Sequence, residues 1–195
     1  MYKILKVQKS RRDIIVEEAS KLFKQRGFKA TSMRDLAENV GMEAASLYNH
    51  IKSKDEILED ICFRLSNRYI SFLDEIDKKP ISAIDKISEL IRLHVRIIIE
   101  DTEGVSVVNN DWKHLKEPAL SRFKEDRKGY EKGMAAIIEK GIAAGEFQKV
   151  NVSVALFTIL SAVRWVELWY KPNRDISPQV LEDDIVLMLL NGLKK

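Results

Sequence analysis

Residues 31–51 read T-S-M-R-D-L-A-E-N-V-G-M-E-A-A-S-L-Y-N-H-I, and this stretch decides the fold of the N-terminal region. The apolar residues of its first half recur at the spacing that keeps them on one face of a short helix: Met33, Leu36, Ala37 and Val40. The hydroxyls of Thr31 and Ser32 can cap the start of this helix, and the glycine after it suits a sharp turn. Leu47 and Ile51 lie one turn apart and predict a second short helix. Two such helices form a helix-turn-helix, whose second helix enters the DNA major groove.

The second helix leaves small or neutral polar side chains on its free faces: Ala44, Ala45, Ser46, Tyr48, Asn49 and His50. Alanine and serine let a helix backbone approach the bases closely, and the last three side chains can hydrogen-bond phosphates or base edges. The pattern alone fits a two-helix corner in some other helical protein equally well. The residues on either side of it favour the DNA-binding interpretation.

The flanking sequence closely resembles the N-terminal domain of the TetR family of transcriptional repressors over about 50 residues. That family's pattern reads A-x-x-L-F-x-x-x-G-[FY]-x-x-T, then I/L-A-x-x-x-G, then L-Y-x-[HY]-F-x-[SN]-K-x-x-L. Here it appears as I-I-V-E-E-A-S-K-L-F-K-Q-R-G-F-K-A-T, D-L-A-E-N-V-G and S-L-Y-N-H-I-K-S-K-D-E-I-L. The resemblance implies an all-α fold: an N-terminal three-helix DNA-binding domain and a C-terminal helical domain that binds a ligand and dimerises.

Three positions depart from the family pattern. Glu43 and Ala45 stand where the family usually has serine and often glycine, and Ile51 replaces a phenylalanine. Glu43 can cap the second helix or accept from cytosine N4, although its charge lowers non-specific affinity for phosphates. These changes leave the fold unaffected and the operator sequence open. The predicted DNA-binding residues are Thr31, Ser32, Arg34, Glu43, Ala44, Ala45, Ser46, Tyr48, Asn49, His50 and Lys54, the last through a phosphate.

Composition favours an all-helical chain, because 195 residues contain only 8 Gly and 4 Pro. The single cysteine excludes an internal disulfide and fits a reducing cytoplasm. We expect no metal, no cofactor and no membrane span, because there is no Cys/His ligand cluster and no apolar run of about 18 residues. Residues 1–12 hold five Lys and Arg and no acid, so this arm can reach phosphates or remain a solvated tail.

Periodicity and capping signals predict the order of the helices. A first helix over 10–26 precedes the helix-turn-helix, and an S-x-x-E capping box at Ser53 and Glu56 opens a long helix. Further helices are expected over 82–100, 118–144, 151–170 and 177–190, with residues 101–110 a loop or a short helix. We therefore expect a DNA-binding domain over 1–54 and an effector-binding and dimerisation domain over 55–195.

The last helix predicts a homodimer. Residues 185–190 read I-V-L-M-L-L, which is apolar on every side. The chain's own core covers one side of such a helix, and a second copy covers the other most simply. The TetR resemblance implies the same, because the family's last two helices form a four-helix dimer interface. Two recognition helices about 34–36 Å apart then match a palindromic operator, and Leu189→Glu is predicted to break the dimer.

The resemblance also implies a small-molecule effector in the C-terminal domain. Candidate ligand-binding residues are His94, Trp112, Phe123, Met134, Arg164, Trp165 and Leu168. Each has a structural alternative. Arg164 can pair with Glu167 one turn away, Trp165 can anchor the core or the dimer, and His94 can be a hydrogen-bonded core histidine.

The stretch R-W-V-E-L-W-Y-K-P resembles a pattern in a TetR subgroup that responds to acyl-coenzyme A thioesters. The predicted function is therefore a ligand-responsive dimeric repressor, released from its operator by an effector such as an acyl-CoA of lipid or aromatic-acid metabolism. Such an effector would need an apolar slot for the acyl chain and basic groups for the phosphates. The slot residues are expected to be Ile91, Phe123, Met134 and Phe157, and the basic residue Arg164, Lys171 or Arg174. The alternative within the family is a regulator of efflux or detoxification that binds a neutral aromatic or drug-like ligand.

Two other function classes remain to be weighed. An enzyme is disfavoured, because the sequence has neither a nucleophile motif nor a Gly-rich phosphate loop. A helical adaptor without DNA affinity is disfavoured by the basic arm and by the small-residue recognition face.

Overall fold

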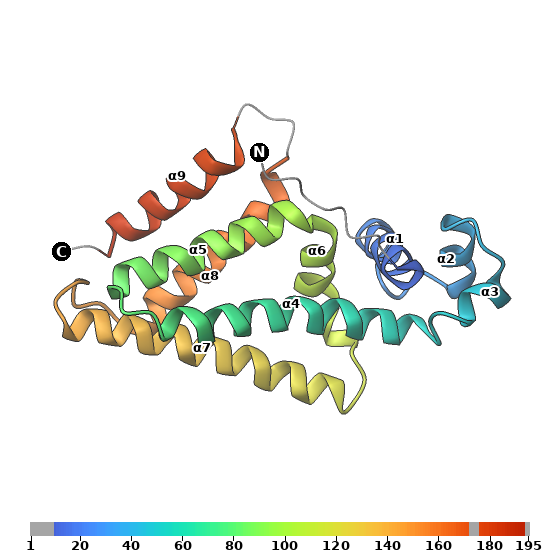
Figure 1. Ribbon diagram of the computed structural model, residues 1–195, viewed down its shortest axis with the longest axis horizontal. Helices are drawn as coiled ribbons and strands as arrows, with labels where there is room; N and C mark the ends of the chain where they lie inside the picture. Colours follow the sequence, from blue (N-terminus) through green and yellow to red (C-terminus); the bar gives the residue numbers. More distant parts are fainter. Residues whose placement is uncertain (1–9, 172–175, 194–195) are drawn as a thin grey trace.

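The structure, a computed structural model, describes residues 10–171 and 176–193, and over these residues it is helical throughout (Figure 1). The basic arm before residue 10 and Arg174 lie outside this range. The helices are α1 (Arg11–Arg26), α2 (Met33–Asn39), α3 (Ala44–Tyr48), α4 (Lys54–Asp77), α5 (Ala83–Glu100), α6 (Thr102–Asp111), η1 (Trp112–His114), α7 (Ala119–Ala143), α8 (Val152–Trp169) and α9 (Pro178–Asn191). The all-α prediction is therefore confirmed.

The helices α1, α2 and α3 gather at one end of the molecule, and local sequence signals fix their ends (Figure 1). Ser10 and Ser32 each form a capping box, with Asp13 and Asp35 respectively. Gly41, between α2 and α3, has φ +65°, a left-handed conformation that side chains bearing a Cβ rarely adopt. These signals produce the predicted helix-turn-helix.

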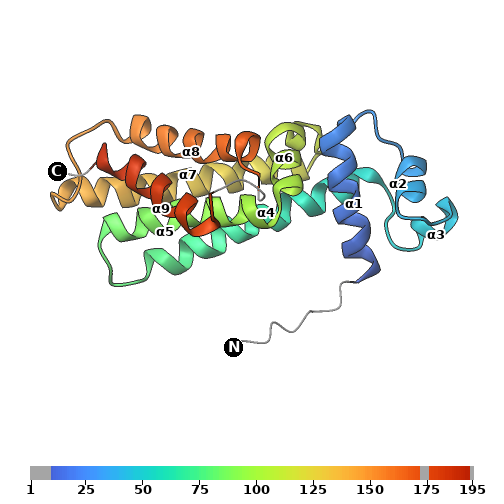
Figure 2. The ribbon, with the colours of Figure 1, turned by 90° about the horizontal axis from the view of Figure 1, so that it is seen from above.

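The long helix α4 runs from this end into the body of the molecule, where it packs against α7, with α5 and α8 beyond (Figures 1 and 2). Ser53 caps α4 by accepting from the Glu56 amide at 3.2 Å. The other half of the predicted capping box is wrong, because the Glu56 carboxylate accepts from the Lys52 amide instead. Gly133 of α7 allows the close approach of α4, since a Cβ there would lie 2.5 Å from Leu73 Cδ2.

The core of the DNA-binding end does not stop at α4. One cluster of buried side chains joins α1–α3 and the first turns of α4 to Val107 of α6, Leu115 and Phe123 of α7. Residues 101–110, left open by the sequence, form α6, and the side chain of Asp101 caps it by accepting from the Gly104 amide at 2.9 Å. The helix α6 therefore contacts α1 on one side and the helices α4, α5 and α8 of the body on the other.

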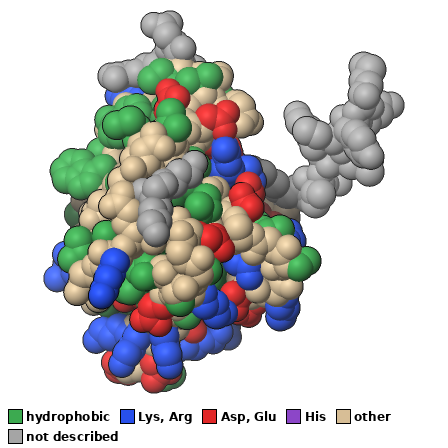
Figure 3. Space-filling model, turned by 90° about the vertical axis from the view of Figure 1, so that its left-hand side faces the viewer, with side chains coloured by type: hydrophobic (Ala, Val, Ile, Leu, Met, Phe, Trp, Pro, Cys, Tyr) green, Lys and Arg blue, Asp and Glu red, His purple; other side chains and the backbone are tan. Residues whose placement is uncertain are grey.

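The last two helices leave a large apolar surface exposed. The exposed apolar side chains on them are Val154, Phe157, Trp165, Leu168, Trp169, Val180, Leu187 and Met188. Figure 3 views the end away from α1–α3, and hydrophobic side chains gather on its upper part, where Figure 1 places α9. Leu189 is half-buried and packs against the chain's own core, so a glutamate there would disturb the fold of the single chain as well as a dimer.

The helix α8 has a composition unlike that of the other helices. Within the described residues it alone is long and apolar enough to cross a membrane by length and composition, with a mean hydropathy of 1.5. One such helix is weak evidence, because core helices of soluble proteins pass the same test. Its exposed apolar face is part of the α8–α9 surface described above.

Candidate nucleic-acid interface and effector cavity

The recognition helix α3 is anchored by two side chains and exposes the others. Leu47 and Ile51 are buried to 0% and 1% exposure in the core under α3. The predicted DNA-binding residues that are exposed are Ser32, Arg34, Glu43, Ala44, Ala45, Ser46, Tyr48, Asn49 and His50. The surface of α3 is therefore made of small and neutral polar groups on a rigid base, with Tyr48 projecting at 52% exposure.

Two of the predicted capping roles at α2 and α3 are wrong, those of Thr31 and Glu43. Thr31 is only 1% exposed, and its hydroxyl donates to the Gly27 carbonyl at 3.0 Å, so it neither caps α2 nor faces outward. Ser32 alone caps α2. Glu43 stands at the N-cap position of α3, but its carboxylate makes no capping hydrogen bond. Its charge is therefore free for other partners.

The structure gives Lys54 partners within the protein, whereas the sequence predicted a phosphate contact. Its ammonium donates to three carbonyl oxygens, those of Phe28 at 2.9 Å, Lys29 at 3.2 Å and Thr31 at 2.9 Å. It also lies 4.7 Å from the centre of the Phe28 ring. A lysine ammonium has three donors, and all three are used here. Lys54 therefore holds the α1–α2 turn against the start of α4.

Lys54→Met is expected to lower the free energy of unfolding by about 1–3 kcal/mol, because three carbonyls lose a charged donor. Urea unfolding measures the change. Lys52→Met, an exposed neighbour on the same loop, is the control and should have no effect. Unchanged stability of Lys54→Met, with a shallower salt dependence of DNA binding, would restore the phosphate role.

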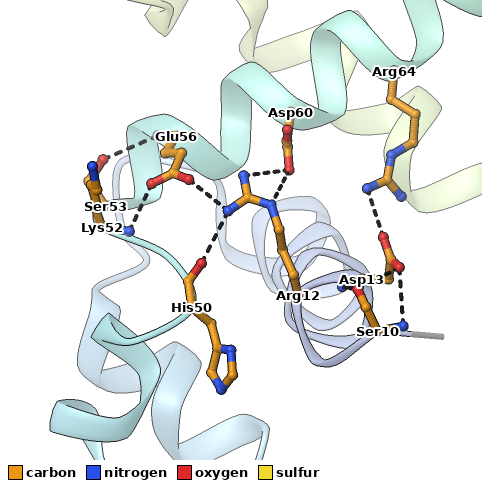
Figure 4. Close-up of polar contacts among 9 residues, drawn as sticks. All are labelled: Ser10, Arg12, Asp13, His50, Lys52, Ser53, Glu56, Asp60 and Arg64. Atoms are coloured by element: carbon orange, nitrogen blue, oxygen red, sulfur yellow. Dashed lines mark hydrogen bonds and ion pairs between the residues drawn. The ribbon is translucent and has the colours of Figure 1, made fainter.

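A group of charged side chains joins α1, α3 and α4, and sequence reasoning missed its role (Figure 4). Arg12 of α1 donates to the His50 carbonyl at the end of α3 at 3.1 Å, to Glu56 at 2.7 Å and to Asp60 at 2.9 Å. We call Arg12, Glu56, Asp60 and the His50 carbonyl the Arg12 clamp. The spacing of Glu56 and Asp60, one turn apart on α4, was visible in the sequence, but their partner 44 residues earlier was not.

The clamp is charged at neutral pH. The hydrogen bond from Arg12 to Glu56 raises the pKa of the guanidinium, against the opposing effect of burial. Burial works to raise the pKa of Glu56, but the Lys52 amide and Arg12 outweigh it and hold that pKa below its ordinary value. The contribution of Glu56 to stability is therefore present at neutral pH and is lost as the pH falls through its folded-state pKa.

Arg12→Ala is expected to weaken operator binding about tenfold, because α3 loses a fixed position relative to α4. Fluorescence anisotropy with a labelled operator measures this. Arg64→Ala is the matched control, since Arg64 also pairs α1 with α4, through Asp13 at 3.4 Å, but does not reach α3.

Glu56→Gln separates positioning from direct contact with DNA. Removing a carboxylate near phosphates would raise affinity if charge alone mattered. If the clamp positions α3, Glu56→Gln instead lowers affinity as Arg12→Ala does. Tighter operator binding by Glu56→Gln would contradict the proposed role of the Arg12 clamp in positioning α3.

A cavity of about 260 Å³ lies in the C-terminal domain between α4, α5, α6, α7 and α8. Four of the predicted ligand-binding residues line it, namely His94, Trp112, Phe123 and Arg164. Phe157, expected in the acyl slot, lines it as well. Because Asn109 and Trp112 belong to α6 and η1, one wall of the cavity is built by the segment that also packs on the DNA-binding end.

Three of the predicted ligand-binding residues do not line this cavity. Met134 is fully buried in the core, as is Ile91 of the expected acyl slot. Trp165 and Leu168 project outward from α8 at 62% and 59% exposure. Helical spacing placed these side chains on the right helices, but it could not tell the inner faces of α7 and α8 from the other faces.

The expected ion pair of Arg164 is also absent. The guanidinium donates to the Asn109 carbonyl at 2.9 Å, and the amide of Asn109 donates to Glu167 at 3.0 Å. Both charged residues of α8 therefore meet α6 rather than each other. This links the wall of the cavity to the helix that contacts α1.

His94 is paired within the cavity wall. Its Nε2 lies 2.9 Å from the Tyr130 hydroxyl, and its ring stacks on Tyr69 with centroids 4.4 Å apart. Burial lowers the pKa of His94 to about 4, so the imidazole is neutral at pH 7. The sequence left open whether His94 is a hydrogen-bonded core histidine or a ligand-binding residue. In the structure it is hydrogen-bonded and also lines the cavity.

Comparisons with known proteins fit this architecture. A family described as the tetracyclin repressor-like C-terminal domain matches residues 80–193, and the tetR family of bacterial regulatory proteins matches residues 15–61. The chain belongs to the TetR family. It is 29% identical over 190 residues to the transcriptional repressor KstR2 of Mycolicibacterium smegmatis, with 94% of this chain and 91% of that protein covered.

Solved TetR-family structures have the same fold. The ketosteroid transcriptional regulator KstR2 of Mycobacterium tuberculosis superposes with a TM-score of 0.91 at 22% identity, covering 99% of this chain and all of the other. AibR, solved with isovaleryl coenzyme A and operator DNA, gives a TM-score of 0.79 at 22% identity, covering 92% and 97%. TetR-family proteins are DNA-binding transcription regulators. An α3 that is anchored by buried Leu47 and Ile51 and exposes its other side chains fits this family role.

Proposed function

We propose that this TetR-family protein is a dimeric, cytoplasmic transcriptional repressor that binds a palindromic operator through α3 and releases it when an acyl-CoA thioester fills the cavity. The exposed face of α3, fixed from below by Leu47 and Ile51, carries the proposal. Residues 1–54 would act as the DNA-binding domain and residues 55–195 as the effector-binding and dimerisation domain.

The dimer is supported by the apolar surface of α8 and α9. Its exposed side chains would lie in water in a single chain, and a second copy would cover them through the same surface on both protomers. A two-fold dimer would also present two α3 helices to the two half-sites of a palindrome. The match to the tetracyclin repressor-like C-terminal domain, over residues 80–193, includes α8 and α9.

An acyl-CoA effector is supported by two arginines in a cavity lining that also holds two carboxylates, those of Asp126 and Glu131. Arg127 and Arg164 line it and are exposed to solvent, so their guanidinium groups can meet phosphates while the apolar interior takes the acyl chain. AibR, which has the same fold, was solved with isovaleryl coenzyme A. The fatty acid metabolism regulator protein of Bacillus subtilis is 20% identical over 181 residues.

The aromatic walls of the cavity favour a second candidate, a neutral aromatic effector of the kind expected for an efflux or detoxification regulator. Trp112 and Phe123 lie against each other with ring centroids 6.0 Å apart. Flat aromatic ligands pack well on such rings. This candidate needs no role for Arg127 and Arg164.

A thermal-shift screen distinguishes the two candidates. A ligand at about 100 times its Kd stabilises the folded state by roughly 2.7 kcal/mol. We expect a shift with CoA thioesters that exceeds the shift with CoA alone, and we expect Arg164→Ala to reduce it. A shift with neutral aromatic compounds only, unaffected by Arg164→Ala, would support the second candidate instead.

A further inference from the structure

The inner wall of the cavity holds a cluster of three polar aromatic side chains from three helices: Tyr69 of α4, His94 of α5 and Tyr130 of α7. Aliphatic side chains line the cavity beside it, among them Ile70 and Ile98. Polar groups on an apolar wall are costly unless they are hydrogen-bonded, so the partner of each polar atom matters.

The cluster satisfies only part of its own hydrogen-bonding capacity. The Tyr130 hydroxyl and His94 Nε2 are 2.9 Å apart and form a hydrogen bond with each other. The ring of Tyr69 stacks on His94, and its centroid lies 5.7 Å from that of Tyr130. Among the described residues, the Tyr69 hydroxyl has no hydrogen-bond partner. It is therefore a donor available to whatever occupies the cavity.

The cluster is neutral at physiological pH. Burial raises the pKa of both tyrosines, so both remain phenols, and the pKa of His94 falls to about 4. The cations that line the cavity, Arg127 and Arg164, are exposed to solvent and belong to its outer side. An anionic group would thus be held by Arg127 or Arg164, while the cluster itself offers only neutral donors and acceptors. The carboxylates of Asp126 and Glu131, which also line the cavity, would repel an anion.

We propose that Tyr69, His94 and Tyr130 bind a neutral oxygen, a ketone or a hydroxyl, near the buried end of the effector's acyl group, and so select oxygen-bearing acyl thioesters over plain alkyl ones. The thioester part of this inference rests on the function proposed above; the preference for a neutral oxygen does not. An alkyl chain would leave the Tyr69 hydroxyl buried without a partner, and a site built to hydrogen-bond discriminates strongly against such an analogue.

Isothermal titration of the full-length protein with matched ligands tests the proposal. The probes are hexanoyl-CoA and 5-oxohexanoyl-CoA, together with the free acids hexanoate and 5-oxohexanoate. The wild-type protein should bind the oxo member of a pair about tenfold more tightly, the effect of one to two hydrogen bonds. Tyr69→Phe should reduce this preference to within about twofold without weakening hexanoyl binding, because the hydroxyl that an alkyl chain leaves without a partner is removed. The Tm of the free protein should not change, because this hydroxyl has no partner among the described residues.

Tyr170→Phe is the matched control, since Tyr170 is a buried tyrosine that does not line the cavity, and its hydroxyl donates to the Ile176 carbonyl at 3.4 Å. It should keep the full preference. A preference seen with the free acids but no binding of either thioester would uphold the cluster and refute the CoA part of the proposed function. Equal affinities within each pair, a preference that survives Tyr69→Phe, or no binding of any probe would overturn the proposal.

Discussion

Met188→Glu is expected to convert the dimer into monomers and to weaken operator binding by about a hundredfold or more. Met188 is 75% exposed on α9 and lies in the apolar surface that a second copy would cover. A glutamate there would lose its water on dimerisation without gaining a partner. Monomers bind one half-site at a time and lose the gain from linked binding.

Sedimentation equilibrium measures the change in mass, and operator anisotropy measures the affinity. Ile81→Glu is the control, because Ile81 is also an exposed apolar residue, at 40% exposure, but lies outside α8 and α9. It should remain dimeric. A Met188→Glu protein that still sediments as a dimer, with unchanged operator affinity, would show that another surface forms the dimer.

Tyr48→Ala is expected to weaken operator binding by about 10- to 100-fold without changing the unfolding midpoint. Tyr48 is 52% exposed at the end of α3, so its removal leaves no internal cavity. A hydrogen bond contributes about 0.5–1.5 kcal/mol, and a symmetric dimer loses it twice, so the total loss is about 1–3 kcal/mol. Operator anisotropy and urea unfolding measure the two quantities.

Tyr48→Phe divides the effect between ring and hydroxyl. It should recover part of the affinity if the ring packs on the DNA and none if the hydroxyl alone contacts it. Wild-type affinity in folded Tyr48→Ala would remove Tyr48 from the interface and would question the orientation proposed for α3.

The helices could be predicted because their signals are local. Ser10 and Gly27 mark the two ends of α1, and Ser177 with Pro178 marks the start of α9. Each of these signals acts within one turn, so a single sequence contains all of it. The exception is α6. Gly104 suggested a loop in the sequence, but the Asp101 side chain caps a helix there.

The roles of charged residues could not be predicted, because they depend on partners far away in the sequence. Lys54 donates to the carbonyls of residues 28, 29 and 31, and Arg12 donates to Glu56 and Asp60 on another helix. Arg164 and Glu167 meet Asn109 rather than each other. Helical periodicity shows which residues share a face but not which element that face contacts.

Filling the cavity with an acyl-CoA thioester is expected to release the DNA. The most direct measurement titrates acyl-CoA thioesters, with free CoA as the control, into a complex of the dimer with an operator selected from random duplex DNA. Fluorescence anisotropy of the labelled operator should fall to the value of free DNA at saturating thioester, and Arg164→Ala should require a higher concentration. Anisotropy that stays at the value of the complex, although the same thioester stabilises the protein against heat, would contradict the claim.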